Sequence, residues 1–164
     1  MVYVGKQVGY HTRTQSEIHE LMSLFAEAGS SVIRLKGGDP YVFGRGGEEM
    51  EYLKAKGITV KCIPGITAAS GISAELGIPL THRGMATSVR FLLGHSREHG
   101  EEELAQSMIQ AIDPYATLVI YMGLMTLPRT IEWLIENGQD PKTPAVAVHA
   151  FQCSSGGSDL VDLG

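Results

Sequence analysis

A glycine-rich stretch, RLKGGDPYVFGRGGEE, covers residues 34–49 and has the residue types of a ligand-binding loop. It holds five glycines and three cations around Asp39. Gly37 and Gly38 allow the backbone to approach a bound molecule closely, and Pro40 fixes the turn. Taken alone, GGDP is equally consistent with an ordinary glycine-rich turn. The elements on either side favour the ligand-loop interpretation.

A predicted strand precedes this stretch and a predicted helix follows it. Residues 31–36 (SVIRLK) have the length and β-branched composition of a buried strand, and residues 47–56 place Met50 and Leu53 on one helical face. In an open α/β sheet, ligands bind outside the carboxyl ends of the strands. The position of the loop therefore predicts a ligand site.

Strand and helix patterns alternate along the rest of the chain. Thr14 and Glu17 form a capping-box pattern for a helix that Gly29 should end. With a strand at residues 2–4 before that helix and the strand at 31–36 after it, the order favours parallel pairing. Further strands are predicted at residues 59–63, 88–94, 117–122 and 145–148, and further helices at residues 68–76, 101–112 and 127–137. The predicted fold class is α/β.

A change of character at residues 79–87 indicates two α/β lobes. We expect the first lobe to span residues 1–80 and the second to span residues 81–148. Residues 149–164 lose all periodicity and become rich in Ser and Gly, which predicts an irregular tail.

The composition is that of a soluble globular protein, with 43% hydrophobic and 19% charged residues. The net charge of −5 is unevenly divided, with +2 in residues 1–94 and −7 in residues 95–164. A pI of about 5.6 and the lack of a basic patch with interleaved aromatics argue against nucleic-acid binding. No apolar run approaches the roughly 18 residues of a membrane helix. Cys62 and Cys153 belong to no metal-ligand spacing, so no metal is expected.

Five stretches resemble the tetrapyrrole C-methyltransferases, a family that uses S-adenosylmethionine. They are VYVGK at residues 2–6, RLKGGDP through FGRGGEE at 34–49, PGITAASG at 64–71, GIPLTHR at 77–83, and YMG at 121–123. They occur in the family's order and spacing over residues 2–148. The resemblance implies the two-lobed tetrapyrrole methylase fold, with a mostly parallel sheet in the first lobe.

The resemblance also implies which residues contact S-adenosylmethionine: Gly37, Gly38, Asp39, Val42, Thr67, Ala68 and Met122. Glycine backbone can reach the ligand, and the carboxylate of Asp39 can offset its positive charge. Thr67 precedes a predicted helix whose free N–H groups suit a polar ligand, although a plain helix cap would also explain it. Buried packing would equally explain Met122.

Methylation of a pyrrole carbon uses the substrate itself as nucleophile, so no activated serine or cysteine is needed. By resemblance, Lys6 corresponds to a proton donor, although a lone lysine is more often a solvated surface charge. The candidates for binding substrate carboxylates are Arg13, Arg45, His82 and Arg83, because guanidinium groups suit carboxylates. Arg34 is a further candidate, or a partner in a structural ion pair.

The implied function is S-adenosylmethionine-dependent C-methylation of uroporphyrinogen III to precorrin-2 in sirohaem biosynthesis, by a homodimer in the cytoplasm, or in the plastid stroma if a leader has been removed. Against the family pattern, an opening strand with its glycine loop is absent before Val2, and strands are absent after Val148. We therefore expect a fold that is incomplete at both termini, with an exposed sheet edge. Two alternatives stay open: a non-catalytic binding or dimerisation partner, and a methylase for another tetrapyrrole.

Overall fold

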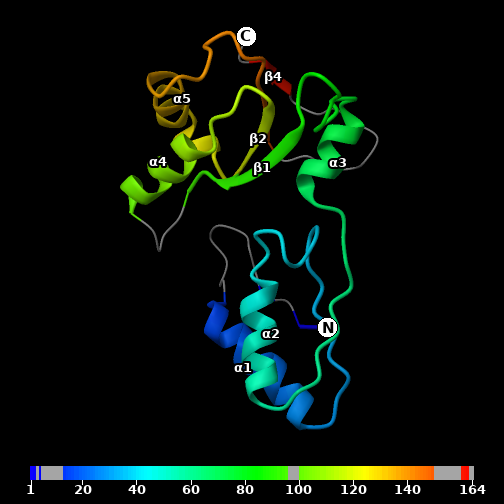
Figure 1. Ribbon diagram of the computed structural model, residues 1–164. Coiled ribbons are helices and arrows are strands. Elements are labelled where there is room, and N and C mark those ends of the chain that lie inside the picture. Colours follow the sequence, from blue (N-terminus) through cyan, green and yellow to red (C-terminus); the bar gives the residue numbers. More distant parts are fainter. Residues whose placement is uncertain (3, 5–12, 96–99, 150–159, 163–164) are drawn as a thin grey trace. The chain divides into compact units, whose positions relative to one another are not determined.

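The computed structural model describes residues 1–164 with the exception of residues 3, 5–12, 96–99, 150–159 and 163–164 (Figure 1). The chain divides into two compact units, Met1–Ala68 and Ala69–Gly164. The sequence places the change of lobe at residues 80 and 81, whereas this division falls at the start of helix α3 (Ala68–Glu75).

The first unit is built on two packed helices, α1 (Gln15–Glu27) and α2 (Gly46–Ala55) (Figure 1). The predicted capping box is confirmed: the hydroxyl of Thr14 accepts from the amide of Glu17, whose carboxylate accepts from the amide of Thr14 at 2.6 Å. Periodic apolar residues of the two helices form the core, which contains Ile18, Met22 and Leu53. These helices support the glycine-rich stretch that enters α2.

The strands predicted at residues 31–36 and 59–63 are not assigned, and this corrects the expectation of a mostly parallel sheet in the first unit. Figure 1 draws no strand arrow over either segment. A strand is defined by hydrogen bonds to a neighbouring strand. Among the described residues, the backbone of neither segment bonds to other backbone. The predicted strand at residues 2–4 includes Tyr3, which lies outside the described residues.

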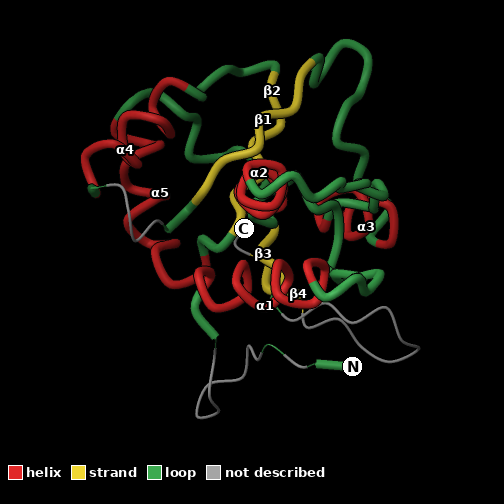
Figure 2. The backbone as a smooth tube through the Cα atoms, turned by 90° about the horizontal axis from the view of Figure 1, so that it is seen from below, coloured by secondary structure: helices red, strands yellow, loops and turns green. Residues whose placement is uncertain are grey.

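The second unit contains a parallel pair of strands, β1 (Ser88–Leu93) and β2 (Ala116–Tyr121), which run side by side in Figure 2. Helix α4 (Glu101–Gln110) connects them, and a short 3-10 helix, η1 (Leu124–Thr126), leads from β2 into α5 (Leu127–Glu136). Helices α4 and α5 pack together, and the fully buried side chains of Met108 and Thr130 come from these two helices. The predicted strand, helix, strand, helix order is confirmed here.

A second pair of strands in this unit is antiparallel. It joins β3 (Val146–Val148) to β4 (Leu160–Asp162). We expected an irregular tail over residues 149–164, but residues 160–162 form a strand because β3 provides the hydrogen-bonding partner that the tail alone lacks. The rest of the predicted tail lies mostly outside the described residues.

Candidate functional site

The glycine-rich stretch folds back on Pro40. A Cβ atom placed on Gly44 or Gly46 would lie 2.7 or 2.5 Å from the carbonyl oxygen of Pro40, so neither position has space for a side chain. The amide of Gly46 donates to that same oxygen at 2.9 Å. Arg45, between them, has a left-handed backbone with φ +58° and occupies the position just before α2. Gly44 and Gly46 are therefore required because their backbone lies too close to that of Pro40 for a side chain.

A second loop meets the glycine-rich stretch at Gly38. A Cβ atom on Gly65 would lie 2.4 Å from the carbonyl oxygen of Gly38, and a Cβ atom on Gly38 would lie 3.3 Å from the carbonyl oxygen of Ile66. Gly38 also has φ +81°, a region that glycine adopts without strain. A Cβ atom on Gly38 would also lie 4.0 Å from the amide nitrogen of Ala68. Two segments of the predicted cofactor site are in contact.

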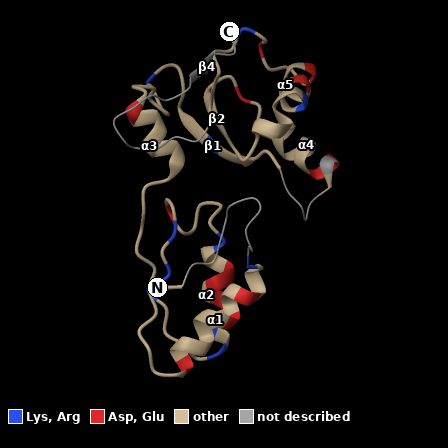
Figure 3. Ribbon diagram, turned by 180° about the vertical axis from the view of Figure 1, so that it is seen from behind, with Lys and Arg blue, Asp and Glu red and all other residues tan. Residues whose placement is uncertain are grey.

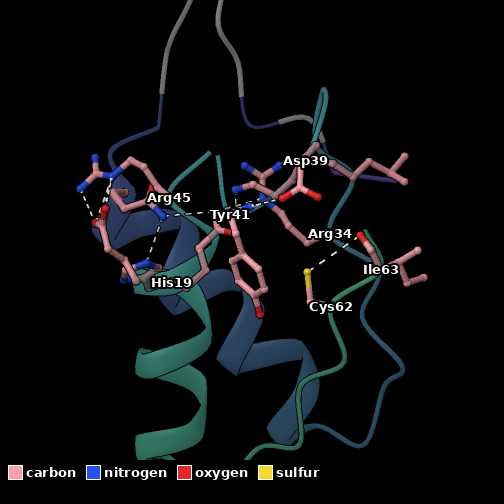
Figure 4. Close-up of polar contacts among 12 residues, drawn as sticks. His19, Arg34, Asp39, Tyr41, Arg45, Cys62 and Ile63 are labelled. Atoms are coloured by element: carbon pink, nitrogen blue, oxygen red, sulfur yellow. Dashed lines mark hydrogen bonds and ion pairs between the residues drawn. The ribbon is translucent and has the colours of Figure 1, made fainter. Parts of the chain in front are cut away.

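Asp39 holds the two loops together (Figure 4). Its Oδ2 accepts a hydrogen bond from the amide of Gly65 at 3.0 Å, and its Oδ1 accepts one from the amide of Tyr41 at 2.9 Å. These amides, Gly65 first and Tyr41 second, lower the pKa of Asp39 below its ordinary value. Asp39 is therefore ionised, and its carboxylate acts as a clamp, meaning that it joins the two loops by hydrogen bonds, as well as supplying negative charge.

Glu49 anchors the segment that leads into the loop. Its side chain, only 7% exposed, accepts from Lys36 at 2.9 Å and from Gln15 of α1 at 3.1 Å, and it lies 3.5 Å from Nε of Arg34. Burial by itself would raise the pKa of Glu49, but the hydrogen bonds from Lys36 and Gln15 outweigh burial and leave the pKa lowered. Arg34 is thus in the structural ion pair that the sequence left as an alternative to substrate binding.

Charged side chains lie on both helices of this unit (Figure 3). The guanidinium of Arg45, a predicted substrate ligand, binds both carboxylate oxygens of Glu48 one turn away, and both side chains are about half exposed. Nearby, the hydroxyl of Tyr41 lies 3.1 Å from the sulfur of Met50. Interaction with Cys62 raises the pKa of Tyr41. Arg45 is accessible to an anionic ligand because half of its surface faces solvent.

In the second unit, two glycines meet where β1 and β2 end. A Cβ atom on Gly94 would lie 2.4 Å from the Cα atom of Gly123, and the hydroxyl of Thr126 donates to the carbonyl oxygen of Gly94 at 2.7 Å. Met122, a predicted cofactor contact, is 60% exposed and has a left-handed backbone with φ +56°. Packing in the core therefore does not explain this methionine. Its place beyond the carboxyl end of a parallel strand is where such sheets bind ligands.

The hydroxyl of Tyr121 accepts a hydrogen bond from the amide of Ala69 at 3.0 Å. Ala69 is buried in the first turn of α3 and follows Ala68 in the sequence, while Tyr121 precedes Met122. This bond satisfies one of the free amides at the start of α3. It also ties the sequence neighbours of two predicted cofactor residues to each other.

Most of the other predicted site residues lie outside these two groups, and Val42 is the exception. His82 bonds through its backbone to Ala86, and its ring Nδ1 lies 3.0 Å from the carbonyl oxygen of Arg83, in an exposed turn. Arg13 lines a shallow cleft with acidic residues of α1 and Lys56. Lys6 lies outside the described residues. Val42 donates its amide to the carbonyl oxygen of Asp39 at 3.3 Å and so belongs to the glycine-rich turn.

Sequence reasoning missed several residues that organise the site. Gly65 and Tyr121 belong to the motifs PGITAASG and YMG, and the sequence assigns no contact to either. Glu49 is the last residue of the motif FGRGGEE, and the motif alone predicts no role for it. The one feature of the sequence that indicates burial of Glu49 is its position one helical turn before Leu53, on the apolar face of α2.

Comparisons with known proteins show the family of this chain. The family described as Tetrapyrrole (Corrin/Porphyrin) Methylases matches residues 2–154. The chain belongs to the tetrapyrrole methylase family. Over 148 residues it is 65% identical to the protein of Arabidopsis thaliana described as S-adenosyl-L-methionine-dependent uroporphyrinogen III methyltransferase, chloroplastic, with 90% of this chain and 40% of that protein covered. A siroheme synthase of Pseudomonas fluorescens is 51% identical, with 90% of this chain and 31% of that protein covered.

Solved structures confirm the fold of this tetrapyrrole methylase chain. The native uroporphyrin III C-methyl transferase of Thermus thermophilus superimposes with a TM-score of 0.75 at 37% identity, covering 98% of this chain and 65% of that one. A structure of the same enzyme complexed with S-adenyl homocysteine gives 0.74 at 36% identity, covering 93% of this chain and 64% of that one. The chain spans less than half the length of these curated relatives. Within the described ranges, no helix has the length and apolarity to cross a membrane, and no cluster of three metal-binding side chains occurs.

Proposed function

We propose that this chain carries out S-adenosylmethionine-dependent C-methylation of uroporphyrinogen III to precorrin-2 in sirohaem biosynthesis. The observation that carries the proposal is the 65% identity to a plant protein described as a uroporphyrinogen III methyltransferase. The fold shared with a transferase that was solved with S-adenyl homocysteine supports it. Both relatives match nearly all of this chain.

The cofactor site in this proposal is the contact between the two glycine loops. Gly37, Gly38 and Asp39 would hold S-adenosylmethionine together with Thr67 and Ala68. The residues fit such a ligand, because no side chain covers the exposed backbone at Gly38 and Gly65 and the ionised Asp39 supplies negative charge. When bound, the cofactor supplies an electrophilic methyl group on a sulfonium centre. Val42 and Met122 are the remaining proposed contacts.

The substrate residues are Arg13, Arg45, His82 and Arg83, and Lys6 is the proposed proton donor. Arg45 has the best support among the described residues, because its half-exposed guanidinium adjoins the cofactor loop in sequence and can exchange Glu48 for a substrate carboxylate. The chain's part in the reaction is to align the pyrrole carbon with the methyl group and to exclude water.

Transfer of a labelled methyl group from S-adenosylmethionine to uroporphyrinogen III tests this function. We expect label in a dimethylated product, and loss of transfer in Gly38→Arg, where a long side chain would enter the contact with Ile66 at a left-handed backbone position. Label that enters only another tetrapyrrole would replace the substrate. No transfer by a folded chain that still binds S-adenosylhomocysteine would favour a non-catalytic binding partner.

We also propose that the chain forms a homodimer and has no nucleic-acid partner. The −7 charge of residues 95–164 supports the second point, because it repels phosphate backbones. The chloroplastic description of the Arabidopsis relative supports a plastid stroma as the compartment, with the cytoplasm as the alternative. Light scattering that gives the mass of one chain across the micromolar range would exclude the dimer.

A further inference from the structure

The glycine-rich stretch contains a loop whose two ends are joined by an ion pair. Lys36 lies just before Gly37, and Glu49 lies just after Glu48 in the first turn of α2. Nζ of Lys36 is 2.9 Å from Oε2 of Glu49, across 13 positions of sequence. Residues 37–48 therefore form a loop that starts and ends at this ion pair, which we call the loop base.

The loop contains most of the residues proposed for the methyl donor and one that is proposed for the substrate. The cofactor residues within it are Gly37, Gly38, Asp39 and Val42, and the substrate residue is Arg45. Asp39 and Arg45 are both labelled in Figure 4. Because all five residues lie between the two ends of the loop, their positions depend on how those ends are held.

Hydrogen bonds inside the loop fix the turn around Pro40. The amide of Tyr41 donates to Oδ1 of Asp39 at 2.9 Å, and the amide of Val42 donates to the carbonyl oxygen of Asp39 at 3.3 Å. The amide of Gly46 donates to the carbonyl oxygen of Pro40 at 2.9 Å. These bonds are local to the turn and do not hold the start of the loop against α2. The loop base makes that contact.

The loop base is largely buried, although burial of charged groups is costly. The side chains of Lys36 and Glu49 are 12% and 7% exposed. Gln15 of α1 donates a further hydrogen bond to Glu49 at 3.1 Å, and Nε of Arg34 lies 3.5 Å away. A buried ion pair often adds no net stability, because apolar residues of similar volume would avoid the loss of hydration. A requirement for defined geometry is then the better explanation of this pair.

A second pair of a lysine and a glutamate in the same unit provides a contrast. Nζ of Lys56 lies 3.3 Å from Glu27, and the two side chains are 39% and 56% exposed. Lys56 follows α2 at the end opposite the loop. A solvated pair of this kind adds little to stability, and it offers a matched control.

We propose that Lys36 and Glu49 are positioning residues, whose ion pair holds the start of the loop against the first turn of α2 and so sets the affinity for the methyl donor. This inference rests on the proposed cofactor site. The effect reaches the ligand through Gly37, the sequence neighbour of Lys36. Loss of either charge releases the start of the loop, and a displacement of about 1 Å in a binding group is enough to weaken binding strongly.

Isothermal titration of the full chain with S-adenosylhomocysteine tests the proposal. We expect Glu49→Gln and Lys36→Met each to weaken binding about tenfold. Glu27→Gln removes the corresponding charge from the exposed pair and should change the affinity less than about twofold. Equal affinities of Glu49→Gln and Glu27→Gln would overturn the proposal.

An apolar replacement of both partners separates positioning from stability. Lys36→Met combined with Glu49→Leu removes both charges together, and Arg34 stays hydrated because it is 29% exposed. This double variant should regain most of the free energy of unfolding that Glu49→Gln loses, because no lysine is left buried without its counter-charge. Binding of S-adenosylhomocysteine should nevertheless stay about tenfold weaker than in the parent chain. Recovery of affinity together with stability would mean a purely structural role and would overturn the proposal.

Amide hydrogen exchange of the ligand-free chain distinguishes failure of this proposal from failure of the proposed function. In Glu49→Gln the amides of Tyr41, Val42 and Gly46 should exchange about fivefold faster relative to those of α1, whereas Glu27→Gln should leave that ratio unchanged. Such faster exchange, in a chain whose parent binds no S-adenosylhomocysteine, would contradict the proposed function and support the ion pair as the holder of the loop. Unchanged exchange in Glu49→Gln would overturn the proposal.

Discussion

The amide of Gly65 donates a 3.0 Å hydrogen bond to Oδ2 of Asp39, across 26 residues of sequence. The bond joins the glycine-rich stretch to the loop that enters α3, and it forms only because Gly65 and Gly38 have no side chains to separate their backbones. A carboxylate is well suited to this contact, since charged acceptors bind backbone amides more strongly than neutral ones. The cofactor site proposed above depends on this bond.

Because the amides of Gly65 and Tyr41 bind the ionised carboxylate of Asp39, the stability of the chain should depend on pH. Its pKa in the folded chain lies below the ordinary 3.8, so the clamp contributes stability above pH 3.8 that is lost as the pH falls through the lower folded value. We expect a carbon-13 NMR titration of this carboxyl to give a midpoint below 3.8, and Asp39→Asn to remove this part of the acid dependence. A midpoint at or above 3.8 would mean that the amides of Gly65 and Tyr41 do not bind the carboxylate in solution.

Gly65→Ala should separate the two loops. The new Cβ atom would lie 2.4 Å from a backbone carbonyl oxygen that cannot rotate away. We expect affinity for S-adenosylhomocysteine to fall at least tenfold, because a loop shift of this size disrupts ligand contacts. The matched control is Gly47→Ala, which meets no atom within 4 Å inside α2 and should bind normally with slightly higher stability. Equal affinities of the two variants would remove the loop contact from the site.

Glu49→Gln should destabilise the first unit by about 3 kcal/mol, because it leaves the cations of Lys36 and Arg34 without a buried counter-charge. Urea unfolding measures this loss in the free energy of unfolding. Glu48→Gln is the control, since its ion pair with Arg45 is about half exposed and should be worth less than about 1 kcal/mol. Similar losses in both variants would contradict the central role of Glu49.

Tyr121→Phe should cost about 1–2 kcal/mol in the second unit, since it leaves the amide of the buried Ala69 without its partner. Tyr115→Phe removes a hydroxyl from a side chain that is 58% exposed and should change the free energy of unfolding little. Thermal unfolding followed by circular dichroism compares the two variants. The bond from Ala69 would be unimportant if both variants melted at the parent temperature.

Local patterns predicted most helices of this chain. The capping box at Thr14 and the apolar spacing of Ile18 and Met22 are properties of neighbouring residues, and α1 follows them. The strands of the second unit were also predicted, because β1 and β2 are strongly apolar and each finds the other as its partner. The spacing of apolar residues and the helix caps thus predict a helix or strand correctly when the elements that it packs against or pairs with are present.

What could not be predicted depends on contacts between distant residues. Residues 31–36 have a strand's composition, but composition does not supply the neighbouring strand that completes the hydrogen bonds. The bond from Gly65 to Asp39 joins two motifs that were recognised separately. The ion pair of Arg34 with Glu49 likewise required the packing of α2 against the loop before its structural role was visible.

Isothermal titration of the full chain with S-adenosylhomocysteine tests most directly whether the two glycine loops form a cofactor site. We predict one site per chain with micromolar affinity, lost in Gly65→Ala and retained in Gly47→Ala. A folded chain that shows no binding heat at several temperatures and no saturation at millimolar ligand would contradict this account.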